Sequence, residues 1–195
     1  MSILLTDVSL RYGDKLVFDR FSLALPDAGL VCVLGPSGCG KTSLLRLLAG
    51  LTQPDSGGVS GVESLVPSMV FQENRLLPWL TALENVSLVL DDGDAEARRW
   101  LEQVELGGEL DKLPGQLSGG MQRRIALARA LAYGGDYLLL DEPFSGLDSA
   151  LAERMLDLIR KLYAGKLVVM ITHDKDISIL ADRVYEVDGI PLTVV

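Results

Sequence analysis

The stretch from Gly35 to Thr42 contains the residue types that hold the phosphates of a nucleotide. It reads GPSGCGKT and follows the pattern G-x-x-x-x-G-K-[S/T]. Glycines let backbone N–H groups turn inward around phosphate oxygens, and a helix that begins here adds the positive end of its dipole. Lys41 supplies a mobile cation for the β- and γ-phosphates, and the Thr42 hydroxyl can bind Mg²⁺. The stretch therefore predicts a site for a nucleotide with magnesium.

Two carboxylates directly follow the apolar run from Tyr137 to Leu140. A buried strand that ends in Asp141 and Glu142 places both at the C-terminal edge of a sheet, where ligands of α/β proteins bind. There Asp141 would hold Mg²⁺ through water, and Glu142 would orient or deprotonate the water that attacks the γ-phosphate. Taken alone, such an acidic pair is usually only a solvated strand end.

A further candidate anion site begins at Ser118, which is followed by Gly119 and Gly120. A serine and two glycines at the start of a helix offer free amides, a hydroxyl and the positive end of the helix dipole. Taken alone, the segment is more simply explained as a helix cap. Its place in the chain, between the phosphate loop and the acidic pair, makes it a candidate for the same site.

The elements that must position these residues alternate between strands and helices. Alternating or wholly apolar runs predict strands, and a helical spacing of apolar residues predicts helices. A strand, a glycine loop and a helix in this order begin a parallel α/β unit. The predicted strands are residues 3–10, 16–25, 30–34, 68–72, 137–140, 167–171 and 183–187, and the predicted helices are residues 41–50, 80–113 with a break at 91–93, 118–132, 149–163 and 177–181.

Composition excludes several classes of partner. The chain has 195 residues, of which 48% are hydrophobic, and a formal net charge of -9. Nucleic-acid binding needs clustered Lys and Arg, so we expect no nucleic-acid partner. No stretch approaches the ~18 apolar residues of a membrane-spanning helix, and the N-terminus does not resemble a signal peptide. Cys32 and Cys39 lack metal-binding spacing, so we expect reduced thiols in a cytosol.

Leu117 to Gln122, read together with the phosphate loop and the acidic pair, resembles the signature sequence of ABC-type ATPases. The chain is thus similar, over almost its whole length, to the ATP-binding subunits of ABC transporters. The resemblance implies an α/β fold: a P-loop NTPase core with a mainly parallel sheet, a small N-terminal antiparallel β subdomain and an inserted helical subdomain. It implies a single domain over residues 1–195, with the core and β subdomain in 1–72 and 134–195 and the helical subdomain, with the signature sequence, in about 73–133.

The resemblance also implies roles for residues outside these motifs. Gln72 is similar to the glutamine that touches Mg²⁺ or the attacking water, and His173 to the histidine that contacts the γ-phosphate. Asp148 resembles the aspartate of the loop that crosses the dimer interface, and Tyr12 the aromatic that stacks on adenine. The implied catalytic residues are Glu142, His173, Gln72 and Lys41; the metal ligands are Thr42, Gln72 and Asp141; and the ATP-binding residues are Tyr12, Gly35, Pro36, Ser37, Gly38, Cys39, Gly40, Lys41, Thr42, Ser43, Ser118, Gly119, Gly120 and Asp148.

The family mechanism implies an ATPase that works as a head-to-tail homodimer. The phosphate loop of one copy faces Ser118 to Gly120 of the other, so that each ATP lies between the two copies. Hydrolysis removes the γ-phosphate contact and opens the dimer, which is a two-state switch driven by ligand. The output goes to separate membrane permease subunits, and we expect the segment from Leu76 to Leu80 to contribute to the groove that receives a cytoplasmic helix of the permease.

The sequence from Leu77 to Thr81, followed by Glu84 to Val86, is similar to that of subunits of the nitrate, sulfonate and taurine importer group. This similarity implies import of a small solute, with a solute-binding protein in the complex. It also implies a peripheral location on the cytoplasmic face of a bacterial or archaeal cell membrane. The transported substrate is not encoded in these residues.

Three alternatives from other classes are weighed against this interpretation. A DNA-repair ABC ATPase would have a long coiled coil between Gln72 and Ser118, and no heptads occur there. A small P-loop kinase would not need the Ser118 segment or a glutamate after Asp141. A module that binds ATP without hydrolysing it is disfavoured by intact Lys41, Asp141, Glu142 and His173, and a hydrolysis assay separates the two. A similar ATPase subunit in membrane release or cell division remains open.

Overall fold

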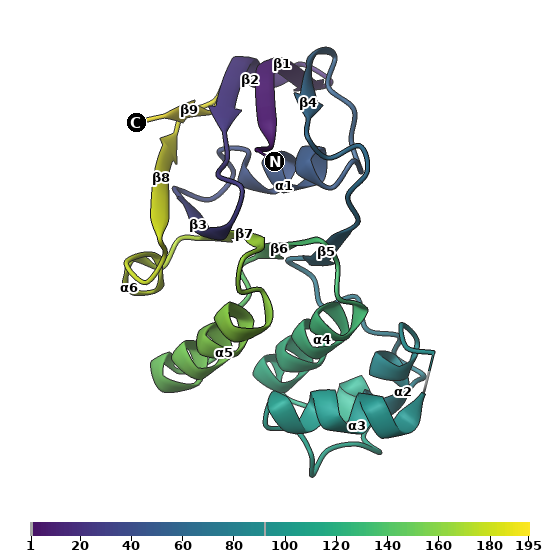
Figure 1. Ribbon diagram of the computed structural model, residues 1–195. Coiled ribbons are helices and arrows are strands. Elements are labelled where there is room, and N and C mark those ends of the chain that lie inside the picture. Colours follow the sequence, from purple (N-terminus) through teal and green to yellow (C-terminus); the bar gives the residue numbers. More distant parts are fainter. Residues whose placement is uncertain (1, 92) are drawn as a thin grey trace. The chain divides into compact units, whose positions relative to one another are not determined.

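The computed structural model describes residues 2–91 and 93–195, which divide into two compact units (Figure 1). The first unit contains residues 2–69, 136–142 and 163–195. The second contains residues 70–91, 93–135 and 143–162. The chain passes between them several times, so that residues far apart in the sequence fold together in each unit.

A six-stranded sheet with the order β5-β6-β7-β3-β8-β9 holds the central strands of the fold. Strand β3 pairs in parallel with β7 on one side and β8 on the other, and β6 pairs in parallel with β7, whereas β9 is antiparallel to β8. Every residue of β6 and β7 is buried, as expected for inner parallel strands. The mainly parallel sheet is confirmed. Its strands are β3 (Gly29–Leu34), β5 (Pro67–Val70), β6 (Tyr137–Asp141), β7 (Leu167–Thr172), β8 (Arg183–Asp188) and β9 (Thr193–Val194).

A separate three-stranded antiparallel sheet forms at the N-terminal end of the chain. Its order is β2-β1-β4, from β1 (Leu4–Tyr12), β2 (Lys15–Ala24) and β4 (Ser56–Ser60). The turn between β1 and β2 uses Gly13 at φ +56°, a left-handed conformation that glycine adopts without steric cost. Phe18 and Phe21 bury their rings against each other with centroids 5.3 Å apart. The predicted small antiparallel sheet is therefore confirmed.

Helix α1 (Lys41–Leu48) follows β3 and the glycine loop, and it contacts β6 and β7. Its four leucines are all buried, and their burial holds the helix against the sheet. The helix ends two residues before the predicted Gly50, because Ala49 caps it and Gly50 leaves at φ +68°. The Tyr137 hydroxyl of β6 donates a 2.7 Å hydrogen bond to the Leu48 carbonyl in this last turn.

The second unit is helical. Its elements are α2 (Ala82–Ser87), α3 (Asp94–Gln103), the 3₁₀ turn η1 (Pro114–Gln116), α4 (Gly119–Tyr133) and α5 (Ser149–Leu162). Helices α2, α3 and α4 pack on one another. Ser118 caps α4 by accepting a 3.2 Å hydrogen bond from the Met121 N–H, and Gly134 ends the helix at φ +69°. The predicted Ser118 cap is confirmed, and the helix ends one residue after the predicted residue 132.

Further predicted boundaries differ from the structure. Residues 104–113 form turns rather than a helix, because Gly107 and Gly108 interrupt the chain while Leu106 and Leu110 still bury their side chains. Strand β5 ends at Val70 instead of residue 72, and α6 (Lys175–Ser178) begins two residues early because the Asp174 side chain caps it. Asp92, in the predicted break at 91–93, lies outside the described residues.

Tyr137→Phe tests how much the bond from β6 to α1 contributes. It removes the hydroxyl donor from a buried carbonyl, so we expect a loss of about 1 kcal/mol in the free energy of unfolding at neutral pH. Burial, with a smaller contribution from Asp136, raises the pKa of Tyr137 from 10.0 to about 12. The folded state therefore holds the proton more tightly, and this stabilisation is complete below pH 10 and lost as the pH rises toward 12.

The measurement is urea unfolding at neutral pH and at about pH 11. Wild type should lose more stability than Tyr137→Phe between the two conditions. Tyr133→Phe is the control because that side chain is exposed, and it should change stability by less than about 0.5 kcal/mol. Equal stability of Tyr137→Phe and wild type at neutral pH would contradict the assigned role.

Candidate functional site

The phosphate loop leaves the C-terminal end of β3 and runs into the first turn of α1. Gly38 and Gly40 have φ +80° and +117°, values that side chains rarely adopt. Gly35 is required for a different reason, since a Cβ there would lie 2.3 Å from the Val187 carbonyl oxygen of β8. Loop conformation and close packing against β8 therefore both depend on glycine at these positions.

Lys41 is the buried cation of the loop, with 7% of its surface exposed. Its Nζ donates hydrogen bonds to the carbonyls of Gly35 and Pro36, both at 2.7 Å. The ammonium thus lies within the curve of the loop backbone. Phosphate oxygens form stronger, charge-assisted bonds to an ammonium than neutral carbonyls do, so they can replace these two acceptors.

Thr42 and Asp141 bring a hydroxyl and a carboxylate together from two elements. The Thr42 Oγ1 donates to Asp141 Oδ2 at 2.8 Å, and Asp141 is only 2% exposed at the end of β6. Mg²⁺ prefers oxygen ligands and is usually bound by one or two carboxylates together with substrate phosphates. This pair fits that ligand set. The described residues contain no cluster of three or more His, Cys, Asp or Glu that could hold a metal ion.

Glu142 lies beside His173 and Thr172 from the end of β7. His173 Nδ1 is 2.8 Å from Glu142 Oε1, and the Thr172 hydroxyl donates to Glu142 Oε2 at 3.2 Å. The Glu142 backbone has φ +50°, a strained value for a residue with a side chain, and its N–H donates to the Ile171 carbonyl at 3.0 Å. A carboxylate fixed in this way can act as a general base on water.

The turn between β1 and β2 also reaches the phosphate loop. Lys15 Nζ donates to the Gly38 carbonyl at 3.3 Å. Tyr12 pairs with Lys15 in the antiparallel ladder and is 44% exposed, so its ring is available to a ligand. Sequence reasoning named Tyr12 but missed Lys15 and Thr172, because their roles arise from contacts between distant segments.

The two cysteines are buried free thiols that form no disulfide with each other. Burial, together with the nearby charge of Glu142, raises the pKa of Cys32 to about 12. A thiol with this pKa stays protonated at neutral pH and is a poor nucleophile. Cys39 belongs to the phosphate loop itself, and its side chain packs in the hydrophobic core.

The remaining predicted residues lie in the second unit. Ser118 and Gly119 are exposed at the start of α4, while a Cβ on Gly120 would lie 2.8 Å from the Gly146 carbonyl oxygen. Asp148 Oδ1 accepts a 2.9 Å hydrogen bond from the Leu151 N–H in the first turn of α5. Gln72 is exposed two residues after β5. The structure thus brings the start of α4 next to the loop that contains Gly146.

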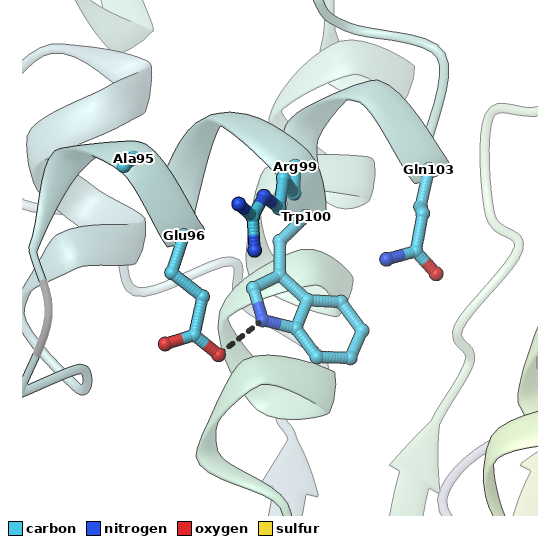
Figure 2. A pocket seen from close by; sticks show the side chains of 5 residues that line it. All are labelled: Ala95, Glu96, Arg99, Trp100 and Gln103. Carbon is cyan, nitrogen blue, oxygen red and sulfur yellow. Dashed lines mark hydrogen bonds between the residues drawn. The ribbon is translucent and has the colours of Figure 1, made fainter.

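The hollows among the described residues include the following two. One of about 370 Å³ borders Gly35, Pro36 and His173, at the beginning of the phosphate loop. The other, of about 430 Å³, lies along α3, where the Trp100 indole N–H donates to Glu96 Oε1 at 3.4 Å (Figure 2). Only the first contains residues that the sequence predicts to be functional. The second is lined by Ala95, Glu96, Arg99, Trp100 and Gln103.

The first unit combines a parallel sheet, a phosphate-binding loop at a strand end and strand-end carboxylates, which define a P-loop nucleotide-binding protein. The family model for ABC transporters matches residues 18–145. The chain therefore belongs to the ABC transporter family, as an ATP-binding subunit with ATPase activity. The described part of the chain contains no helix with the length and apolar character needed to span a bilayer.

Curated relatives support the same family. An aliphatic sulfonates import ATP-binding protein of Paraburkholderia xenovorans is 48% identical over 179 residues, which are 89% of this chain and 72% of that protein. A protein of the same name from Shouchella clausii is 41% identical over 193 residues, which are 97% of this chain and 78% of that protein. These names agree with the predicted nitrate, sulfonate and taurine importer group.

Solved structures support the fold. A dimeric ATP-binding cassette in a post-hydrolysis state, bound to ADP and Pi, superposes with a TM-score of 0.86 at 30% identity. A dimeric bacterial ABC transporter cassette gives the same TM-score at 31% identity. Each alignment covers 94% of this chain and 93% of the other.

Gly35→Ala tests the close approach of the phosphate loop to β8. The new Cβ would meet a backbone oxygen, so either the loop or β8 must shift, and we expect a loss of about 1–3 kcal/mol in stability. Since the loop amides would no longer converge on one point, ATP affinity should fall at least about tenfold, which is about 1.4 kcal/mol of binding free energy.

Thermal unfolding and titration with a fluorescent ATP analogue measure the two effects. Gly108→Ala is the matched control, because its Cβ would meet open space at an ordinary backbone conformation. A Gly35→Ala chain that binds ATP as tightly as wild type would show that the loop tolerates this displacement.

Proposed function

We propose that this chain binds ATP with Mg²⁺ as a head-to-tail homodimer and drives separate permease subunits. One observation carries the proposal: the chain contains two half-sites of different kinds. Lys41, Thr42, Asp141 and Glu142 can hold and hydrolyse MgATP, while Ser118 begins a helix with an exposed hydroxyl and exposed glycine. A helix start of this kind is suited to a phosphate that another copy presents. The dimeric form of the two solved cassettes supports this arrangement.

Each predicted residue keeps its role within this proposal. Thr42 and Asp141 hold Mg²⁺ with Gln72, Lys41 neutralises the phosphates, and Glu142 activates water. His173 lies 2.8 Å from Glu142, close enough to orient that carboxylate while the other ring nitrogen faces the γ-phosphate. The ATP-binding set of the sequence prediction, Tyr12, residues 35–43, Ser118 to Gly120 and Asp148, is retained. The proposal also retains a single ABC ATPase domain, with a helical subdomain inserted at about residues 73–133.

The partners and the location follow from the importer relatives. We infer that the chain sits on the cytoplasmic face of the membrane, beneath permease subunits that work with a solute-binding protein. Trp79 is 70% exposed in the segment from Leu76 to Leu80, and aromatic side chains are enriched in protein–protein interfaces. The name shared by the curated relatives favours aliphatic sulfonates as the imported solute.

Glu142→Gln tests the composite site. The amide keeps the size of the side chain but cannot accept the proton of the attacking water, so ATP should bind and persist, and the dimer should stay closed. We would measure the solution mass of the variant with ATP and with ADP. A dimer that forms only with ATP is the expected result.

Lys41→Ala is the control, since it should bind ATP weakly and remain monomeric under both conditions. Chelation of Mg²⁺ should stop hydrolysis by wild type, because the Thr42–Asp141 pair would lack its cation. A Glu142→Gln chain that binds ATP and stays monomeric would mean that closure requires the permease. Absence of ATP binding in wild type would overturn the proposal.

The solute can be tested separately in the source organism. Deletion of this chain should abolish growth on an alkanesulfonate as the only sulfur source and leave growth on sulfate unchanged. Return of the wild-type chain should restore growth, whereas Glu142→Gln should not. Unchanged growth of the deletion strain on several alkanesulfonates would exclude this solute class while leaving the ATPase proposal intact.

A further inference from the structure

Arg123 is a buried cation in the interior of α4, with 3% of its surface exposed. Nothing in the phosphate chemistry described above uses it. Its guanidinium donates to backbone carbonyls on two other segments of the second unit. Nε donates to Pro143 at 3.3 Å, and Nη1 donates to the carbonyls of Phe71 and, at 3.3 Å, Gln72. Nη1 also lies 3.3 Å from Asn74 Oδ1.

These acceptors explain why a charged group can be buried there. An ionised side chain that leaves water is strongly destabilising unless hydrogen bonds replace its hydration. The guanidinium has five N–H donors in a rigid plane, so it can reach several acceptors at fixed angles. One side chain consequently joins three segments: helix α4, the segment from Phe71 to Asn74, and Pro143.

The two segments that Arg123 joins contain or directly follow residues that we propose take part in ATP hydrolysis. Pro143 directly follows Glu142, and Gln72 is the proposed ligand of Mg²⁺ or the attacking water. We propose that Arg123 is a positioning residue for ATP hydrolysis, which fixes the backbone of Gln72 and of the residue after Glu142 against one rigid helix. This inference rests on the proposed function of Gln72 and Glu142.

Other arginines of the same helix have different contacts. Arg129 Nη2 donates to the carbonyls of Asn74, at 3.2 Å, and Arg75, at 2.9 Å, so it supports the far end of the glutamine segment. Arg124 Nη1 donates to the carbonyls of Val104, at 2.8 Å, and Glu105, at 3.0 Å. Of these three arginines, Arg123 is the one that bonds to both Gln72 and Pro143, which makes Arg124 a matched control from the adjacent position.

A double-mutant cycle tests the link between Arg123 and Gln72. We would measure ATP hydrolysis at saturating MgATP and, separately, ATP affinity for Arg123→Met, Gln72→Ala and the double variant. Arg123→Met should lower kcat at least about tenfold, because small displacements of reacting groups are costly, while ATP affinity stays within about twofold. In the Gln72→Ala background it should lower kcat by a smaller factor than in wild type, since one of the two side chains it positions is already absent and only the loss through Pro143 and Glu142 remains.

Arg123→Lys and Arg124→Met are the comparison variants. The lysine keeps the charge but not the planar set of donors, so its kcat should fall between those of wild type and Arg123→Met. Arg124→Met should combine additively with Gln72→Ala. Additive losses for Arg123→Met and Gln72→Ala would overturn the positioning role and indicate a general effect on folding.

Amide hydrogen exchange tests, independently of hydrolysis, whether Arg123 holds the two segments in place. In Arg123→Met, exchange should become faster at residues 71–75 and at 144–146, whereas Arg124→Met should affect residues around 104–106. If wild type hydrolyses no ATP, the proposed function fails, and this exchange pattern still reports whether Arg123 holds both segments. Unchanged exchange at both segments in a folded Arg123→Met chain would refute the inference. Arg123→Lys serves in its place if the methionine variant does not fold.

Discussion

The hydrogen bond from Thr42 to Asp141 is the contact on which the nucleotide site depends, because it joins the helix of the phosphate loop to the strand-end carboxylate. It can form because β3 and β6 both pair in parallel with β7, which brings their C-terminal ends to the same edge of the sheet. Packing maintains it: α1 buries its leucines, and β6 buries every residue up to Asp141. Hydrophobic burial over these elements, rather than the bond itself, supplies the stability that holds two polar groups in place.

The strained backbone at Glu142 follows from the same arrangement. Its φ of +50° turns the chain away from the sheet directly after Asp141, so that consecutive carboxylates point to different partners. The strain costs of order 1–3 kcal/mol and persists only where the surroundings fix the conformation. Here the Glu142 N–H extends the pairing with β7 through Ile171, and Thr172 and His173 hold the side chain. Asp141 faces Thr42 and Glu142 faces His173 because the backbone turns between them.

Local patterns predicted the parts of the fold that local chemistry determines. Gly35 to Thr42 required a strand before it and a helix after it, and the structure has both. Residues 104–113 were predicted wrongly because buried leucines at helical spacing occur in a chain that glycines turn. Strand β5 stops early because the carbonyls of Phe71 and Gln72 bond to Arg123 instead. Arg123, Lys15 and Thr172 gave no signal, since their partners lie far away along the chain.

Helix α4 combines two environments that sequence periodicity alone does not separate. Its first residues are exposed beside a loop that approaches Gly120, and its interior buries Arg123 five residues after Ser118. A helix rises about 1.5 Å per residue, so these positions lie about 7.5 Å apart along one rigid rod. A group that contacts Ser118 therefore acts on the same helix whose Arg123 donates hydrogen bonds to Gln72 and Pro143. Within the proposed dimer, α4 therefore links the phosphate that the second copy presents to the residues that flank the proposed hydrolytic site.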